Sequence, residues 1–272
     1  MPNQVEFLRT AEDQDIQSLK ENWLKSLSRP QDGMWEAFRD MAIHWGIKDG
    51  ENWIGYACMN ADHQLIQFYI SPEHLDRGSV ILQSFLREFM VHAAIIGTNN
   101  PIFFSLASPL FQQIKPHTYL YEKVVEVEMK ERSGEFRLCQ MDDLAEMVTY
   151  CHFATGGPEA WLEGYIKNLI EKGEIFMLRN EEEIIGSCEV RKSITAPAYA
   201  DIGMIVSANH RKKGYGSYLL NRAKEISLSW GKTPICSTTL DNIGSQRAIK
   251  NCGFRSMHQL LEVHFDNSKL GV

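Results

Sequence analysis

The segment at residues 205–220, IVSANHRKKGYGSYLL, combines positive charge with conformational freedom over a few positions. Three consecutive cations lead into two glycines: Arg211, Lys212, Lys213, Gly214 and Gly216. Glycine has no Cβ, so backbone N–H groups beside it can approach a ligand closely. If a helix begins here, its first N–H groups are unpaired donors at the positive end of the helix dipole. Such a loop suits phosphate oxygens, and a pyrophosphate is the ligand that we expect.

The sequence around this loop excludes two common kinds of phosphate-binding loop. An apolar, strand-like run ends directly before the loop, and a helical pattern begins directly after it. The loop lacks the third glycine of a dinucleotide-binding fingerprint and the Gly-Lys-[Ser/Thr] ending of a Walker loop. A turn before a helix would also explain the two glycines. A second motif downstream, DNIGSQRAIKNCGF at residues 241–254, therefore carries much of the specificity.

Together the two motifs resemble the GNAT superfamily of acyl-CoA-dependent N-acetyltransferases, over about residues 135–265. The resemblance implies that the [Arg/Gln]-x-x-Gly-x-Gly segment wraps the pyrophosphate of CoA, through Arg211, Lys212, Lys213, Gly214, Tyr215, Gly216 and Ser217. It also implies that the pantetheine arm is held by backbone groups of Met204, Ile205 and Val206. On the second motif, Asn242 and Ser245 would contact CoA.

The catalytic residues are less clear from the sequence than the CoA-binding ones. The resemblance implies direct attack of an amine on the thioester, and the proton of the amine then needs a base or an ordered water path. The candidates for the base are Asp201, at the head of the fourth predicted strand of the second half, Glu189 on the third, and His152. Each could instead be a solvated, ion-paired or partly buried side chain, and Tyr199 could line the acceptor pocket. The usual general acid of the family, a tyrosine seven residues after the motif asparagine, is replaced by Ile249.

The two halves of the sequence show the same order of secondary-structure patterns. This internal repeat predicts the elements that position the candidate site residues. Each half shows two helix patterns, two strand-like runs around a polar turn, then a strand, a loop and a helix. Gly55 and Gly186 occupy equivalent places, and in the second half Asp142 is expected to cap the first helix. We predict an α/β (α+β) fold with two tandem GNAT-like domains, each a mixed, mainly antiparallel sheet flanked by helices. One larger mixed α/β domain is the alternative.

The predicted domains are residues 1–130, a degenerate GNAT-like copy, and residues 131–272, the acetyl-CoA-binding copy. Aligning Ile70 with Val206 places Asp76 and Val80 where the second half has Lys212 and Gly216. A carboxylate repels phosphate and a β-branched side chain blocks close backbone approach. We therefore expect no CoA on the first copy, which shapes the substrate cleft or supports the second copy.

Composition limits the classes of partner. Of the 272 residues 44% are hydrophobic and 23% charged, typical of a soluble globular protein, and the formal net charge of -7 argues against nucleic acid. The six cysteines show no zinc-type spacing, so no metal is expected, and their scatter suggests a reducing compartment. No secretion signal is visible at the start, and no apolar run reaches the length of a membrane helix. We expect a cytoplasmic protein without a membrane partner, as a monomer or homodimer.

These observations predict an N-acetyltransferase that moves an acetyl group from acetyl-CoA to a primary amine of a small molecule or peptide, by direct attack in a ternary complex. Acetyl-CoA is then a co-substrate. The alternative is a CoA or acyl-CoA sensor that binds but does not turn over, which the missing tyrosine keeps open.

Overall fold

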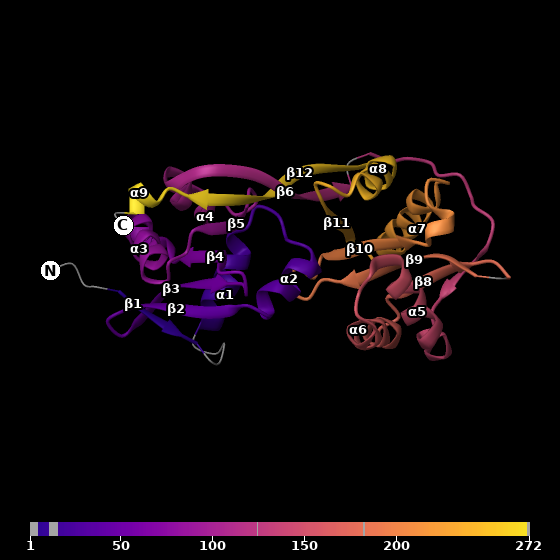
Figure 1. The fold of residues 1–272 in the computed structure, drawn as a ribbon, viewed down its shortest axis with the longest axis horizontal. Helices are drawn as coiled ribbons and strands as arrows, with labels where there is room; N and C mark the ends of the chain where they lie inside the picture. The colour runs from indigo at the N-terminus through magenta and orange to yellow at the C-terminus, as the bar shows by residue number, and fades with distance from the viewer. Residues whose placement is uncertain (1–4, 11–15, 124, 182, 271–272) are drawn as a thin grey trace. The chain divides into compact units, whose positions relative to one another are not determined.

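The computed structural model describes residues 5–10, 16–123, 125–181 and 183–270. Contacts divide the chain into two compact units (Figure 1), which are Met1–Tyr119 with His258–Val272, and Leu120–Met257. Two strands, β6 (Phe111–Lys123) and β12 (Phe254–Phe265), contribute residues to both units. The last strand of the chain therefore completes the first unit as well as the second.

The first unit is built on a mixed, mainly antiparallel sheet with the strand order β1-β2-β3-β4-β5-β12. Its further strands are β1 (Glu6–Arg9), β2 (Ile43–Asp49), β3 (Asn52–Met59), β4 (Gln64–Ile70) and β5 (Ala93–Gly97). Neighbours from β1 to β4 pair antiparallel, whereas β4 and β5 pair parallel at Gln64 and Leu65. Residues Leu260–His264 of β12 pair antiparallel with β5, and β6 is the neighbour of β12 on its other side.

Helices cover both faces of the first sheet. They are α1 (Gln17–Ser26), α2 (Gly33–Asp40), α3 (Leu75–Glu88), α4 (Pro101–Ala107) and α9 (Asn267–Leu270). Trp23 of α1 packs on the same face as Tyr69. Phe68 points to the opposite face, as the alternation of a strand requires, and packs there with Phe85 of α3 and Phe103 of α4.

The second unit repeats this plan with the strand order β11-β10-β9-β8-β7. The strands are β7 (Glu135–Leu138), β8 (Ile175–Arg179), β9 (Ile184–Lys192), β10 (Tyr199–Val206) and β11 (Thr233–Thr239). The helices are α5 (Leu144–Thr155), α6 (Glu159–Glu171), α7 (Tyr215–Ser229) and α8 (Ile243–Asn251). Residues of α5 and α6 pack with Ile175 and Met177 on one face, and Leu219 of α7 lies against Gly186 on the other.

The start of α5 differs from the prediction. A 3₁₀ turn, Met141–Asp143, precedes the helix, and Gln140 forms a reciprocal capping box with Asp143. The expected cap, Asp142, is exposed and does not cap α5, whose N-cap position is Asp143. Asp143 accepts the Gln140 N–H at 2.7 Å and two Arg137 N–H bonds at 2.7 Å each, so the preceding strand selects this carboxylate.

The register of the strands confirms the internal repeat. Gly55 pairs with Ile70 across β3 and β4, and Gly186 pairs with Val206 across β9 and β10. Gly55 and Gly186 match in sequence, and so do their strand partners Ile70 and Val206. The two halves share one antiparallel pair in one register, as a tandem GNAT-like fold predicts.

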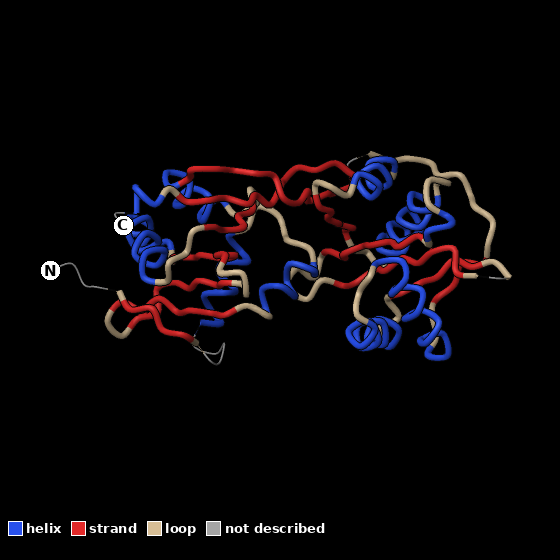
Figure 2. The backbone as a smooth tube through the Cα atoms, in the orientation of Figure 1, coloured by secondary structure: helices blue, strands red, loops and turns tan. Residues whose placement is uncertain are grey.

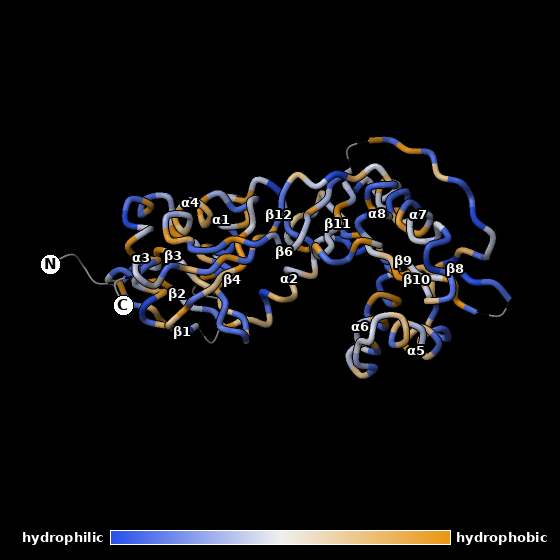
Figure 3. Tube along the Cα trace, turned by 45° about the horizontal axis from the view of Figure 1, so that its top comes forward, coloured by the Kyte–Doolittle hydropathy of each residue, from blue (hydrophilic) through white to orange (hydrophobic). Residues whose placement is uncertain are grey.

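The connection between β6 and β7 lies along the second unit. Residues 125–134 carry no helix or strand (Figure 2) and are mainly hydrophilic (Figure 3). Val125 N–H donates to the Gly253 carbonyl at 3.0 Å, and the Tyr218 hydroxyl donates to Glu131 at 3.3 Å. Tyr218 belongs to the first turn of α7, so the connection passes beside the start of that helix.

Within the described ranges, no helix combines the length and hydropathy that crossing a membrane requires.

Candidate active site

Strands β10 and β11 part at the level of the predicted pantetheine site. Their parallel pairing runs from Tyr199–Thr233 to Asp201–Ile235. On its other edge, β10 stays paired with β9 as far as Val206–Gly186. The backbone of Met204, Ile205 and Val206 therefore lies beyond the last β11 pair, where an extended ligand can take the place of a strand.

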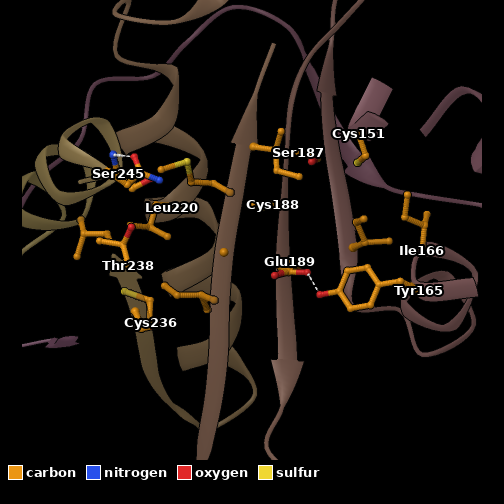
Figure 4. A pocket seen from close by; sticks show the side chains of 18 of the residues that line it. Cys151, Tyr165, Ile166, Ser187, Cys188, Glu189, Leu220, Cys236, Thr238 and Ser245 are labelled. Carbon is orange, nitrogen blue, oxygen red and sulfur yellow. Dashed lines mark hydrogen bonds between the residues drawn. The ribbon is translucent and has the colours of Figure 1, made fainter. Parts of the chain in front are cut away.

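A cavity of about 240 Å³ occupies this gap and extends to both faces of the sheet (Figure 4). Its lining comes from α5 and α6 on one face, from α7 and α8 on the other, and from strands β8 to β11 between them. Five predicted site residues line it: Glu189, Met204, Ile205, Asn242 and Ser245. Val206 and the loop after β10 lie outside its lining.

The loop has the backbone shape that the glycines led us to expect. Lys212 adopts φ 62° and Gly214 φ 88°, both in the left-handed region. Gly214 is the N-cap of α7 and provides no side chain to bond the first turn. A Cβ added to Gly216 would meet Met204 Sδ and Ala248 Cβ at 3.6 Å, an ordinary contact distance. Gly214, rather than Gly216, is therefore the position where the local fold requires glycine.

The cations of the loop differ in their partners. Arg211 donates from Nε to the Val206 carbonyl at 3.2 Å and from Nη2 to the Ala154 carbonyl at 2.8 Å, so it braces the loop. Lys212 and Lys213 are exposed, and neither is ion-paired with a carboxylate of the described chain. These two ammonium groups are available to an anion.

Arg132 was missed by the sequence analysis. Its Nη2 occupies the space that a Cβ on Gly214 would need, and its Cζ lies 6.0 Å from the centroid of the Tyr215 ring. A third cation, from the connection before β7, therefore lies against the positive end of α7. Arg132 lies next to the predicted domain boundary after residue 130, and the sequence carries no signal for this contact, because it joins residues about eighty positions apart.

The second motif forms the start of α8. Asn242 is its N-cap, and its Oδ1 accepts the Ser245 N–H at 3.1 Å. Ser217, at the start of α7, is buried, and its Oγ accepts a bond from Asn251 Nδ2 at 3.5 Å. Ser217 therefore faces α8, while Asn242 and Ser245 stay at the cavity.

Glu189 brings a carboxylate to the α6 side of the cavity. The Tyr165 hydroxyl donates to its Oε2 at 2.5 Å (Figure 4), and Arg191 Nε lies 3.7 Å from its Oε1. A Cβ on Gly203 would lie 2.7 Å from Oε1, so the carboxylate rests where only glycine leaves room. Burial, followed by the charge of Glu189, raises the pKa of Tyr165, which keeps the phenol a donor.

The other acid–base candidates lie apart from the cavity. Asp201 is 2% exposed, pairs with Arg191 across β9 and β10, and is not part of the lining. His152 Nδ1 lies 2.8 Å from the Gly157 carbonyl oxygen, at the end of α5, and does not line the cavity either. Tyr199 begins β10 outside the lining, whereas Ile249 is 3% exposed and lines it.

Two family models match the chain, both of them acetyltransferases. Residues 12–124 match an acetyltransferase (GNAT) domain, and residues 128–254 match the acetyltransferase (GNAT) family. The chain belongs to the GNAT acetyltransferase family. It carries two such domains in tandem, and they identify the protein as an acyltransferase.

Solved structures of GNAT proteins share the whole fold. An acetyltransferase of the GNAT family from Colwellia psychrerythraea is 27% identical with a TM-score of 0.92, over 96% of this chain and 100% of its own. A tandem GNAT protein from the clavulanic acid biosynthesis pathway is 13% identical with a TM-score of 0.66, over 96% and 98%. A GCN5-related N-acetyltransferase from Sphaerobacter thermophilus is 14% identical with a TM-score of 0.66, over 97% and 96%. No curated protein matches the chain in sequence.

Proposed function

We propose that the second unit of this GNAT protein transfers an acetyl group from acetyl-CoA to a primary amine of a small molecule or peptide. The observation that supports it best is the cavity between β10 and β11, because its lining includes both the α8 motif and Glu189. A thioester entering from the α8 side would present its carbonyl carbon to an amine bound on the α6 side. The two substrates would then react directly, in a ternary complex.

On the CoA side, the proposal uses the loop, the splayed strand and the α8 cap. The diphosphate would lie at the start of α7, where the N–H groups around Gly214 and Gly216 and the ammonium groups of Lys212 and Lys213 would bind its oxygens. The pantetheine amides would bond the backbone of Met204, Ile205 and Val206 beyond the last β11 pair. Arg211 would hold the loop in place through its hydrogen bonds to the Val206 and Ala154 carbonyls. The remaining CoA contacts would come from Tyr215, Ser217, Asn242 and Ser245.

On the amine side, we assign the base to Glu189 in preference to Asp201. A lysine-like ammonium has a pKa of about 10.4, so only about one molecule in 2,500 is the free base at pH 7, a cost of about 4.6 kcal/mol. A base beside the cavity can take this proton, and Glu189 is the carboxylate that lines it. Tyr165 and Gly203 orient that carboxylate, by a hydrogen bond and by leaving space.

A sensor that binds CoA without turnover is the second candidate. It is favoured by Ile249, an apolar side chain at the cavity where the family resemblance implies a tyrosine acid. A thiol has a pKa of about 8.5, so CoA thiolate needs far less help to leave than the amine needs to lose its proton. We therefore give preference to the enzyme.

In this proposal the first unit does not itself bind CoA. At the start of its α3, Asp76 lies in the first turn and Arg77 forms an ion pair with Asp49 at 2.5 Å. By the alignment of Ile70 with Val206, Arg77 corresponds to Lys213 of the second half, so this cation of the first copy is engaged within the fold. All six cysteines are free and buried, which fits the reducing cytoplasm that we propose as the compartment.

Turnover with a panel of primary amines, followed by release of free thiol, tests this function. We expect thiol release that depends on both acetyl-CoA and one class of amine. Calorimetry with CoA supplies the comparison. Tight CoA binding with no release on any amine would favour the sensor, and no binding at all would remove both candidates.

A further inference from the structure

Three buried nitrogen donors of the first unit, one each on α1, α2 and β4, have no acceptor among the described residues. They are the indole Nε1 of Trp23, the guanidinium Nη1 of Arg39 and the amide Nε2 of Gln67. The three residues are 1%, 8% and 2% exposed. No carboxylate in the described part of the chain is ion-paired with Arg39.

A chain of contacts gathers these donors on one face of the sheet. The Arg39 Cζ lies 5.0 Å from the centroid of the Trp23 ring. The Arg39 carbonyl oxygen lies 2.9 Å from His44 Nε2 and 3.7 Å from Cys58 Sγ. Cys58 pairs directly with Gln67 across β3 and β4, so their side chains leave the sheet on the same face.

Burying these donors costs free energy unless an acceptor is bound. A buried N–H group without an acceptor costs about 1–3 kcal/mol, and a charged group costs more. A guanidinium cannot lose its proton to avoid the cost. The Trp23 ring gives Arg39 a cation–π contact, but it supplies no acceptor to the N–H groups. Three such donors therefore indicate an occupant that brings oxygen acceptors and a negative charge.

The same place in the second unit is the amine side of the cavity. The register of the repeat makes the pair Cys58–Gln67 equivalent to Glu189–Gly203. The second unit has a carboxylate there, and a glycine that leaves room for it. The first unit has an amide donor and, from α2, a guanidinium. The charge of the site is thus inverted between the two copies.

We propose that the first unit binds a small carboxylate beneath α1 and α2. Its two oxygens would accept hydrogen bonds from Arg39, Trp23 and Gln67, and its single charge matches that of Arg39. A carboxylate offers about four acceptor positions, enough for all three donors. The site is independent of acetyl transfer, and its occupancy does not require that the second unit be an enzyme.

Nuclear magnetic resonance of the full chain, labelled with ¹⁵N at tryptophan, tests this site. The indole resonance of Trp23 is assigned by its loss in Trp23→Phe. We expect acetate to move this resonance downfield to saturation, because its N–H gains an acceptor. Sodium chloride at equal ionic strength and methylammonium chloride should leave it unchanged. A linear drift with acetate, or an equal response to chloride, overturns the proposal.

Matched variants separate binding from a general effect of acetate. Arg39→Gln should weaken the acetate response at least tenfold, and Gln67→Leu several-fold. Arg87→Gln, an exposed arginine of α3, should leave it unchanged. CoA binding to the second unit and an otherwise unchanged indole spectrum show that each variant is folded. An undiminished response in folded Arg39→Gln, or crystals in which acetate leaves only a water network at the donors, would refute a carboxylate site.

Discussion

Glu189 owes its position to a residue that has no side chain. Gly203 lies opposite it in the sheet, and the carboxylate fills the space that a Cβ would need. Tyr165 then holds one oxygen, and Arg191 lies near the other. A sheet residue that faces a covering helix is usually apolar, so a carboxylate fixed in this way beside a cavity is unusual. At the scale of single residues, this arrangement supports a base more than a structural role.

Glu189→Gln keeps the shape of the side chain and removes its basicity. We expect kcat to fall about 10²–10³-fold with little change in the KM for acetyl-CoA, as loss of a general base predicts. Glu163→Gln, on the exposed side of α6, is the control. Steady-state kinetics with the best amine provides the measurement. An unchanged kcat in Glu189→Gln would remove this residue from the mechanism.

Tyr165→Phe should act differently, because Tyr165 positions the carboxylate and is not itself the base. Because burial raises its pKa above the usual value of about 10, the phenol stays protonated near neutral pH, and the hydroxyl adds no titration to the rate profile there. We expect kcat to fall about tenfold while both limbs of the pH–rate profile stay in place. Loss of the basic limb in Tyr165→Phe would instead assign the titrating group to this tyrosine.

Cys151, Cys188 and Cys236 line the cavity, and burial raises the pKa of the first two thiols, which argues against an acetyl-cysteine intermediate at either. Burial raises the pKa of Cys151 to about 12, so the thiolate fraction at pH 8 is about one in 10⁴. We expect Cys151→Ala to retain turnover within a few-fold. We also expect Ellman's reagent to label the native protein slowly at pH 8. Rapid labelling of Cys151, or loss of turnover in Cys151→Ala, would support a covalent route.

At the scale of elements, the start of α7 joins backbone shape to ligand binding. Gly214 has φ 88°, and Gly231, just after the other end of the helix, has φ 70°. Replacing either by alanine adds backbone strain of about 1–2 kcal/mol. Only the Gly214 side chain would also meet the Arg132 guanidinium, since nothing lies within 4 Å of the Gly231 Cβ position.

Gly214→Ala should therefore raise the KM for acetyl-CoA by about tenfold or more, because the loop and Arg132 must both shift. Gly231→Ala should lower thermal stability to a similar extent and leave this KM unchanged. Kinetics and thermal unfolding of the two variants give the comparison. Equal KM values in both variants would argue against a diphosphate at this loop.

The capping box before α5 links charge to stability. The Arg137 guanidinium lowers the pKa of Asp143 by hydrogen bonding, and the Asp143 side chain is 11% exposed. A carboxyl with a lowered pKa contributes its full stability above its unfolded pKa of about 3.9, and loses it as the pH falls through the folded value. The same group caps the turn, so its loss affects both the ion pair and the helix start.

Asp143→Asn should lower the free energy of unfolding by about 2 kcal/mol at pH 7, since it breaks a largely buried pair. The difference from the wild type should shrink below pH 4, where the wild-type carboxyl also becomes protonated. Asp142→Asn, at the exposed neighbour, should be neutral. Urea unfolding at several pH values measures this, and a difference independent of pH would assign the effect to packing rather than charge.

At the scale of the whole molecule, the C-terminal strand completes the first unit. Residues Leu260–His264 pair with β5, and Val263, Phe265 and Leu270 are buried in the first core. This core therefore contains residues from both ends of the chain. The last strand must be present before the first unit can bury its apolar surface fully.

Phe265→Ala should destabilise the first unit by about 3–4 kcal/mol, the usual cost of emptying a buried phenylalanine site. Met257→Ala, on the same strand but 65% exposed, should change the stability little. Hydrogen exchange at the β3 and β4 amides reports on the first unit directly. Unchanged protection of those amides in Phe265→Ala would contradict the assignment of this strand to the first core.

The sequence by itself determined the tandem GNAT fold, the internal repeat and the shape of the loop at Gly214. These features can be read from short stretches of sequence. The spacing of apolar residues indicates helices and strands, and a glycine marks a position where the backbone can adopt a positive φ. Comparison of the two halves could even anticipate the strand register at Gly55 and Gly186, because these aligned glycines pair with the aligned residues Ile70 and Val206.

Only the tertiary structure decided which side chains meet. It brought Arg132 to Gly214, Tyr165 to Glu189 and β12 to β5, and it left Asp201 outside the cavity lining. It also left buried donors of Trp23 on α1, Arg39 on α2 and Gln67 on β4 without an acceptor among the described residues. These contacts join residues that are far apart in the chain, and their geometry depends on how helices pack on the sheet, for which no short stretch of sequence carries a signal.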